Sequence, residues 1–193
     1  MESEGQGIRP PAPVLVDVTA GDVAACHAFA LRCSRLRQYA GAGGWRGGLV
    51  PAMKLFGGID VDGTTAGIVI GKVGEIAMCR LAGVDVDLAL KDRGDGGKDL
   101  SLPCGRVQVK TGRKPFASRL VRDPIEHVDW FVFATWSGLA GSVSIDGYIA
   151  HAAVLRFPLY PAKRGTWMNR EVPESRLRPI RSLLKIRPID EVL

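Results

Sequence analysis

The feature that most restricts how this chain can fold is an almost wholly apolar helical segment, KVGEIAMCRLA, at Lys72–Ala82. Gly83 follows it directly, and glycine is typical of the position where a helix ends. A helix with so few polar side chains has to be covered by other parts of the protein. Its acid, Glu75, shares a face with Cys79 and Ala82, so the carboxylate needs a partner to offset the cost of burial.

Two short strands joined by a tight reversal are predicted after this helix. Asp99–Leu102 and Arg106–Thr111 have the composition of strands, and residues 103–105 (Pro-Cys-Gly) form the reversal between them. Side chains alternate along a strand, so Gln108 and Lys110 lie on one face of the second strand. Polar groups therefore converge on one side of this strand pair.

The remaining elements are predicted from hydrophobic periodicity and from turn residues. We expect a helix from Asp22 to about Gln38, a turn at Asp60–Gly63, strands at Val84–Leu90 and within Ile125–Trp136, a strand pair at Ser142–Leu155 around Asp146-Gly147, and a short helix after Pro173 interrupted near Pro179. The mixture of helices and strands indicates an α/β fold.

Length and composition favour one folded domain. The 193 residues are 46% hydrophobic and 24% charged, which is enough to bury a core without disulfides. Pro10, Pro11 and Pro13 break up the polar start of the chain, so residues 1–13 are expected to form a flexible N-terminal arm and residues 14–193 a single domain.

Several classes of protein are disfavoured by simple patterns. The four cysteines show neither zinc-ligand nor redox spacing, and they are interpreted as buried thiols. No apolar run reaches the roughly 18 residues that a membrane span requires, and the N-terminus does not resemble a signal peptide. We therefore expect a cytoplasmic protein without a membrane partner.

The charge of the chain favours a polyanionic partner. The net charge is +6, and basic residues concentrate in two stretches with few acids. Such concentrations are typical of proteins that bind nucleic acid, although a solvated basic surface is an equally ordinary explanation for each stretch alone. The two stretches are Arg106, Lys110, Arg113, Lys114, Arg119 and Arg122, and then Lys163, Arg164, Arg170, Arg176, Arg178, Arg181, Lys185 and Arg187.

The order of polar residues matches the needs of phosphodiester hydrolysis. That reaction uses oxygen ligands for a hard divalent cation, a positioned water and positive charge near the phosphate. Glu75 and Asp99 can supply oxygens, and Lys110, beside Gln108 on the same strand face, can hold the water or stabilise developing charge.

Three segments together resemble the core of the PD-(D/E)XK nucleases, a superfamily that includes many restriction enzymes. They are GKVGE at 71–75, GDGGKDL at 94–100 and VQVKT at 107–111. The Gly-Asp-Gly-Gly-x-Asp turn followed by a Gln-x-Lys strand is similar to the Mrr-type branch. The resemblance implies a restriction-endonuclease-like core, a four-stranded mixed sheet flanked by helices, in a Mg²⁺-dependent DNA endonuclease, with Mn²⁺ as an alternative ion.

The resemblance also implies roles for individual residues. Glu75, Asp99 and Gln108 would be the metal ligands, and Lys110 would complete the catalytic set. Gln108 stands where the family usually has an acid, so the site loses a negative charge. Asp99 is preferred as the ligand because it starts a strand, while Asp95, Asp85 and Asp87 remain weaker candidates.

Phosphate contacts and partners follow from the same resemblance. Arg113 and Lys114, directly after the active strand, are the best candidates for contacts with DNA, followed by Arg106 and Arg119. Restriction enzymes of this fold commonly act as dimers, which suggests a homodimer. Two alternatives stay open, namely a catalytically inactive nucleic-acid-binding module of the same fold and a structure-specific repair or junction-resolving nuclease.

Overall fold

A computed structural model describes residues 10–39, 53–88, 99–113, 119–123, 128–161 and 168–186. The helices of these residues are α1 (Ala20–Tyr39), α2 (Gly63–Ala82), α3 (His151–Val154), α4 (Ile180–Leu183) and the 3-10 turn η1 (Glu174–Arg176). The strands are β1 (Val14–Asp17), β2 (Met53–Leu55), β3 (Ile59–Val61), β4 (Leu100–Leu102), β5 (Gly105–Gly112), β6 (Leu120–Asp123), β7 (Trp130–Thr135), β8 (Ser142–Ala150), β9 (Leu159–Pro161) and β10 (Met168–Glu171).

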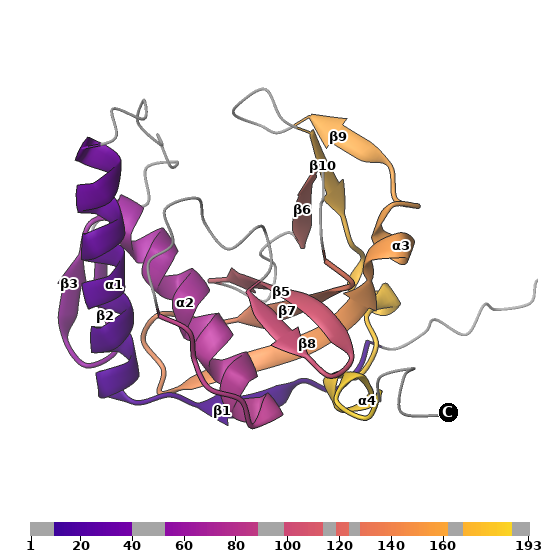
Figure 1. The fold of residues 1–193 in the computed structure, drawn as a ribbon, viewed down its shortest axis with the longest axis horizontal. Coiled ribbons are helices and arrows are strands. Elements are labelled where there is room, and N and C mark those ends of the chain that lie inside the picture. Colours follow the sequence, from indigo (N-terminus) through magenta and orange to yellow (C-terminus); the bar gives the residue numbers. More distant parts are fainter. Residues whose placement is uncertain are drawn as a thin grey trace, which may run out of the picture.

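The main sheet has five strands in the order β1-β8-β7-β5-β4 (Figure 1). β5 runs antiparallel to β4 and parallel to β7, and β8 is antiparallel to both β7 and β1. The predicted α/β class with a mixed sheet and helices is therefore confirmed. The expected number of four strands is wrong, because Val14–Asp17 pairs with β8 and adds a fifth strand at the edge.

Helix α2 lies between α1 and the main sheet (Figure 1). Its start is fixed by Asp62, whose carboxylate accepts a hydrogen bond of 2.8 Å from the Thr65 N–H, and its end by Gly83 in the left-handed conformation. The predicted stop at Gly83 is confirmed. The predicted turn at Asp60–Gly63 is wrong, because Ile59–Val61 is a strand and Asp62 caps the helix.

Alternation of side chains gives the two faces of the sheet separate cores. Val107, Val109 and Val132 pack in a large cluster with the apolar side chains of α2 and α1. Phe131 and Phe133 point to the opposite face and pack in a second cluster beneath α3 and β6. The face that meets α2 is therefore largely apolar along these strands, with Thr111 as a polar exception on β5, and Gln108 and Lys110 lie on the other face.

A bulge interrupts the pairing of β7 with β8. Phe133 pairs with Gly147 but Ala134 pairs with Ile145, so Asp146 is an extra residue on β8. Gly147 has φ 152°, and a Cβ there would lie 2.7 Å from the backbone oxygen of Arg178. The predicted strand pair around Asp146-Gly147 is thus one continuous strand with a bulge, and a bulge commonly re-aims a side chain.

Two other expectations differ from the structure. Residues 84–88 form no strand, and 89–90 lie outside the described residues. A strand requires a hydrogen-bonded neighbour. In the main sheet the position next to β5 is taken by β4, so residues 84–88 do not pair there. Leu155 belongs to no strand, since His151–Val154 forms α3 instead.

Other expectations agree with the structure or lie beyond it. α1 and α4 occupy the segments where helices were predicted, and Pro179 directly precedes α4. Residues 10–13 form neither helix nor strand, and residues 1–9 of the predicted arm lie outside the described residues.

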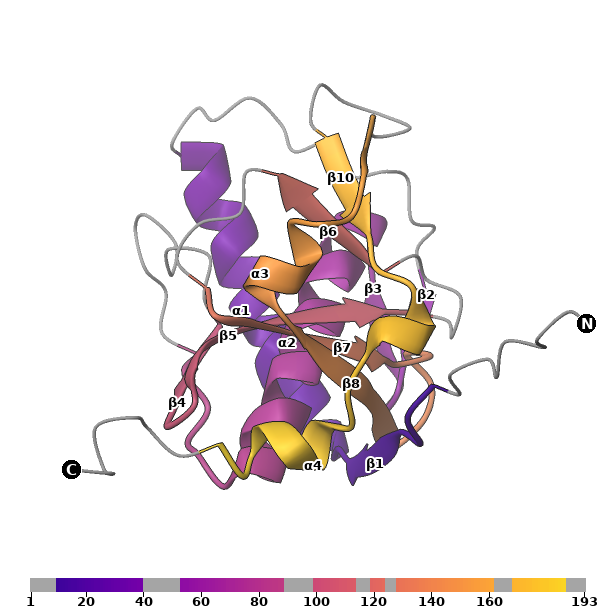
Figure 2. The same ribbon diagram turned by 90° about the vertical axis from the view of Figure 1, so that its right-hand side faces the viewer.

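A second, three-stranded sheet in the order β6-β10-β9 stands on the side of the main sheet opposite α2 (Figures 1 and 2). β10 is antiparallel to both of its neighbours. β2 and β3 form a separate antiparallel pair beside α1. As for membranes, none of the helices in the described ranges combines the length and apolar character needed to cross one.

Gly74 is the point of closest approach between α2 and β5. A Cβ at this position would lie 1.8 Å from the Thr111 Oγ1, whereas a Cβ on Gly71 of the same helix would meet nothing within 4 Å. We therefore expect Gly74→Ala to lower the free energy of unfolding by about 1–3 kcal/mol through overpacking. Gly71→Ala should raise it by up to about 1 kcal/mol, because alanine is the better helix former.

Urea denaturation followed by circular dichroism measures both changes. Equal stabilities of the two variants would contradict the close contact between α2 and β5.

Candidate active site

The β4–β5 hairpin fixes the position of Asp99. Leu100 pairs with Val107, and the Asp99 N–H donates to the Val107 carbonyl over 2.9 Å. The Val109 N–H then donates to Asp99 Oδ2 over 2.7 Å. The carboxylate thus takes the place of a main-chain carbonyl in the ladder, and it lies where strand pairing ends.

Gln108 and Lys110 lie on the face of β5 that points away from α2. They pair with Phe131 and Phe133 of the parallel strand β7, and those two rings belong to the core on that face. Both polar side chains are partly buried. The structure therefore agrees that Gln108 and Lys110 share one face, and it brings Asp99 to the backbone between them.

Glu75 lies on α2, and therefore on the other side of β5. Its carboxylate forms an ion pair with Lys72, one turn earlier on the same helix, and its side chain is only 12% exposed. The Lys72 ammonium in turn lies 5.0 Å from the centre of the Phe29 ring of α1. The partner that burial of this acid requires is thus a lysine at the interface of α1 and α2.

The thiol of Cys79 lies within the electrostatic reach of both predicted acids. Burial raises its pKa to about 11, and the negative charges of Glu75, Asp85 and Asp99 contribute to the increase, against the opposing effect of Lys72. Cys26 of α1 also has its pKa raised, to about 12, by burial and then by Glu75. These thiols are protonated near neutral pH, as expected for buried cysteines.

The four predicted site residues consequently form two groups. Asp99, Gln108 and Lys110 are neighbours on the β4–β5 hairpin, whereas Glu75 approaches from the helix layer. Within the described ranges, no three His, Cys, Asp or Glu side chains converge as a possible metal site. Mg²⁺ commonly uses only one or two protein carboxylates together with water and substrate phosphate, and Asp99 with the Gln108 amide oxygen fits that requirement.

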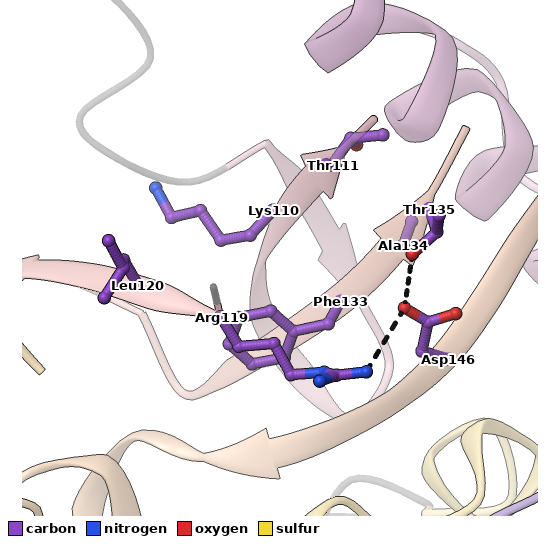
Figure 3. Close-up of a pocket in the computed structure, with 9 residues that line it drawn as sticks. Lys110, Thr111, Arg119, Leu120, Phe133, Ala134, Thr135 and Asp146 are labelled. Atoms are coloured by element: carbon purple, nitrogen blue, oxygen red, sulfur yellow. Dashed lines mark hydrogen bonds and ion pairs between the residues drawn. The ribbon is translucent and has the colours of Figure 1, made fainter. Parts of the chain in front are cut away.

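A cavity of about 150 Å³ opens at the carboxyl ends of β5 and β7, and we call it the β5–β7 cavity (Figure 3). It is lined by residues 110–112, 119–120 and 133–135 and by Asp146. Lys110 therefore borders both the hairpin with Asp99 and this cavity. In open α/β sheets, ligands commonly bind beyond the carboxyl ends of parallel strands.

Asp146 is the acid of the β5–β7 cavity, and the sequence did not indicate it. Its Oδ2 accepts a hydrogen bond of 2.8 Å from the Thr135 hydroxyl, and its Oδ1 accepts one of 2.9 Å from the Ser144 hydroxyl. An Asp-Gly pair between apolar runs usually predicts a turn. The glycine inside a strand pattern was the available signal for the bulge.

The predicted DNA contacts differ in their surroundings. Arg113 is exposed. Arg106 is half-exposed and pairs with Asp129, whose carboxyl pKa is lowered mainly by the hydrogen bond from the Arg106 backbone N–H. Arg119 is mostly buried and faces two acids. Lys114 and Asp95 lie outside the described residues.

Comparison of the chain with protein-family models, with curated proteins and with solved structures found no match.

The hydrogen bond between Asp99 and Val109 allows a test of the hairpin geometry. Asp99→Asn keeps an acceptor oxygen for the Val109 N–H, while Asp99→Ala leaves this partly buried donor without it. We expect the alanine variant to lose about 1–3 kcal/mol of unfolding free energy and the asparagine variant distinctly less. Urea denaturation of the three proteins measures these free energies. Equal losses in the two variants would argue against the hydrogen bond from the Val109 N–H to the Asp99 side chain.

Proposed function

We propose that this protein is a metal-dependent DNA nuclease of the PD-(D/E)XK type that hydrolyses phosphodiester bonds as an endonuclease. One observation carries the proposal. The Asp99 carboxylate is held by the Val109 N–H, between the positions of Gln108 and Lys110, at the place where β4 and β5 cease to pair. An acid thereby lies against the backbone between the residues that carry an amide and an amine.

These groups have distinct chemical roles in the proposed reaction. Asp99 would bind Mg²⁺ or Mn²⁺ through the carboxylate oxygen that does not accept from Val109, and the Gln108 amide oxygen would complete the protein ligands. The bound ion would supply Lewis acidity at the phosphate and a more acidic water. Lys110 would donate hydrogen bonds to the attacking water or to the phosphate oxygen on which negative charge develops.

Glu75 is a weaker candidate than Asp99 for a metal ligand in this proposal. It shares the electrostatic environment of Cys79 with Asp99 but lies with Lys72 on the helix side of β5. As a second metal ligand, Glu75 would have to exchange its ion pair with Lys72 for the metal ion. Asp99 is therefore the ligand to which we give priority.

The sheet topology and the charge support a restriction-endonuclease-like core that binds DNA. β5, which carries Gln108 and Lys110, runs antiparallel to β4 and parallel to β7, within a mixed sheet covered by α2, and Asp99 directly precedes β4. The net charge of +6 and the side chains of Arg113 and Arg106 would favour contacts with phosphates that weaken as salt increases. A homodimer belongs to the same proposal.

Cleavage assays with variants of the hairpin test the proposal. The purified protein is expected to nick or linearise supercoiled plasmid in Mg²⁺ or Mn²⁺ and to lose activity in EDTA. Lys110→Ala should reduce the rate on the order of 100-fold or more. Asp99→Asn should abolish cleavage while retaining the fold. Lys54→Ala, which changes an exposed lysine of β2, is the matched control and should cut at the wild-type rate.

The outcomes separate the proposal from its alternatives. Equal cleavage by wild type, Lys110→Ala and Asp99→Asn would refute the assigned site. Salt-sensitive binding of DNA without any cleavage would identify the protein as a binding module. A strong preference for branched DNA over plasmid and linear duplex would identify a structure-specific nuclease.

Gln108 offers a test by gain of function. The neutral amide favours the binding-module alternative, because the site has one carboxylate fewer than the family pattern. If the proposal holds, Gln108→Glu restores the acid and lowers the Mg²⁺ concentration needed for half-maximal cleavage. The magnesium dependence of initial plasmid-nicking rates measures this effect. An unchanged or higher requirement would show that residue 108 does not contribute to ion binding.

A further inference from the structure

The β5–β7 cavity contains a cationic group, Arg119, one of whose hydrogen-bond donors is not used within the described residues. Arg119 is 12% exposed and faces the Asp146 carboxylate at 3.8 Å and the Glu174 carboxylate at 3.3 Å. Its Nε is buried and has no hydrogen-bond partner among the described residues. A buried donor without an acceptor is rare in proteins and points to a bound ligand or water.

Asp146 holds the Arg119 side chain without occupying its Nε. Both carboxylate oxygens of Asp146 already accept hydrogen bonds from the hydroxyls of Thr135 and Ser144. At 3.8 Å the guanidinium is beyond hydrogen-bonding distance of this carboxylate, so the interaction is electrostatic. In Figure 3 the guanidinium end of Arg119 points toward Asp146. Asp146 is thus a positioning residue for Arg119.

The balance of charge in the cavity favours an anion. The charged residues that line the cavity are two cations, Lys110 and Arg119, and one acid, Asp146. Glu174 does not line the cavity and is half-exposed, so solvent screens its charge. Guanidinium N–H groups in a fixed plane match the geometry of phosphate oxygens better than any other side chain does.

We propose that the β5–β7 cavity binds a phosphate group through Arg119 Nε, with Lys110 as the second cation of its lining. The identity of this phosphate rests on the proposed nuclease function. In that case it is a backbone phosphodiester of the DNA, next to the one that is cleaved. Arg119 then contacts DNA from inside a cavity formed by the sheet, and not from the exposed surface where Arg113 lies.

Arginine Nε–Hε resonances of the nitrogen-15-labelled protein report directly on this contact. The Arg119 signal is identified by its absence from the spectrum of Arg119→Lys. Titration with inorganic phosphate, without divalent metal, is expected to move it downfield in a saturable manner, and sodium chloride at equal ionic strength is not. The thymidine dinucleotide TpT, which carries one phosphodiester, is expected to move the same signal.

Variants separate phosphate binding from a purely structural role of the Arg119–Asp146 pair. Asp146→Asn removes the competing negative charge and keeps polar groups for both hydroxyls, so phosphate should bind several-fold more tightly. Arg119→Lys should bind it at least several-fold more weakly, as measured by shifts of backbone amides around residues 110–112. Arg32→Lys, an exposed arginine of α1, is the matched control and should bind as the wild type does.

Each outcome bears on the cavity alone, because the titrations need no cleavage. Absence of a saturable shift of the Arg119 signal would overturn the proposal and leave water as the partner of Nε. A response to inorganic phosphate but not to TpT would overturn the phosphodiester source. If the protein does not cleave plasmid but the Arg119 signal shows a saturable shift, the proposed nuclease activity is refuted and the phosphate site is supported.

Discussion

Burial of α2 on two sides is the constraint on which the rest of the structure depends. The helix carries apolar side chains around most of its circumference, so it requires α1 on one side and the sheet on the other. Its close approach to β5 at Gly74 and Thr111 leaves no room for an additional methyl group. The strands beneath it therefore present mainly valine and alanine to the helix, with Thr111 opposite Gly74.

This division of the sheet determines where polar chemistry can occur. Since Val107 and Val109 face α2, Gln108 and Lys110 necessarily face the opposite side. On that side aromatic side chains fill the middle of the sheet, and the polar groups gather at the ends of β5 and β7. Lys110 links the two polar regions, because it neighbours the end of the β4–β5 ladder and borders the cavity.

Much of the hairpin and part of its polar face could be predicted from local sequence. The reversal before Gly105, the strand at 105–112 and the shared face of Gln108 and Lys110 all follow from turn residues and a period of two. The edge strand β1 and the first turns of α2 could not be predicted, because pairing with β8 and burial between layers stabilise them more than local propensity does.

The sequence by itself determined the hairpin, the apolar helix that ends at Gly83, and the presence of an acid, an amide and an amine at close spacing. Only the tertiary structure decided that Glu75 is buried in an ion pair with Lys72 and that Asp146 lines the same cavity as Lys110. The physical reason is that periodicity fixes which residues of one element share a face. Which face of an element packs against a neighbouring element depends on contacts between residues distant in the chain. The same holds for a bulge that shifts the pairing of two strands.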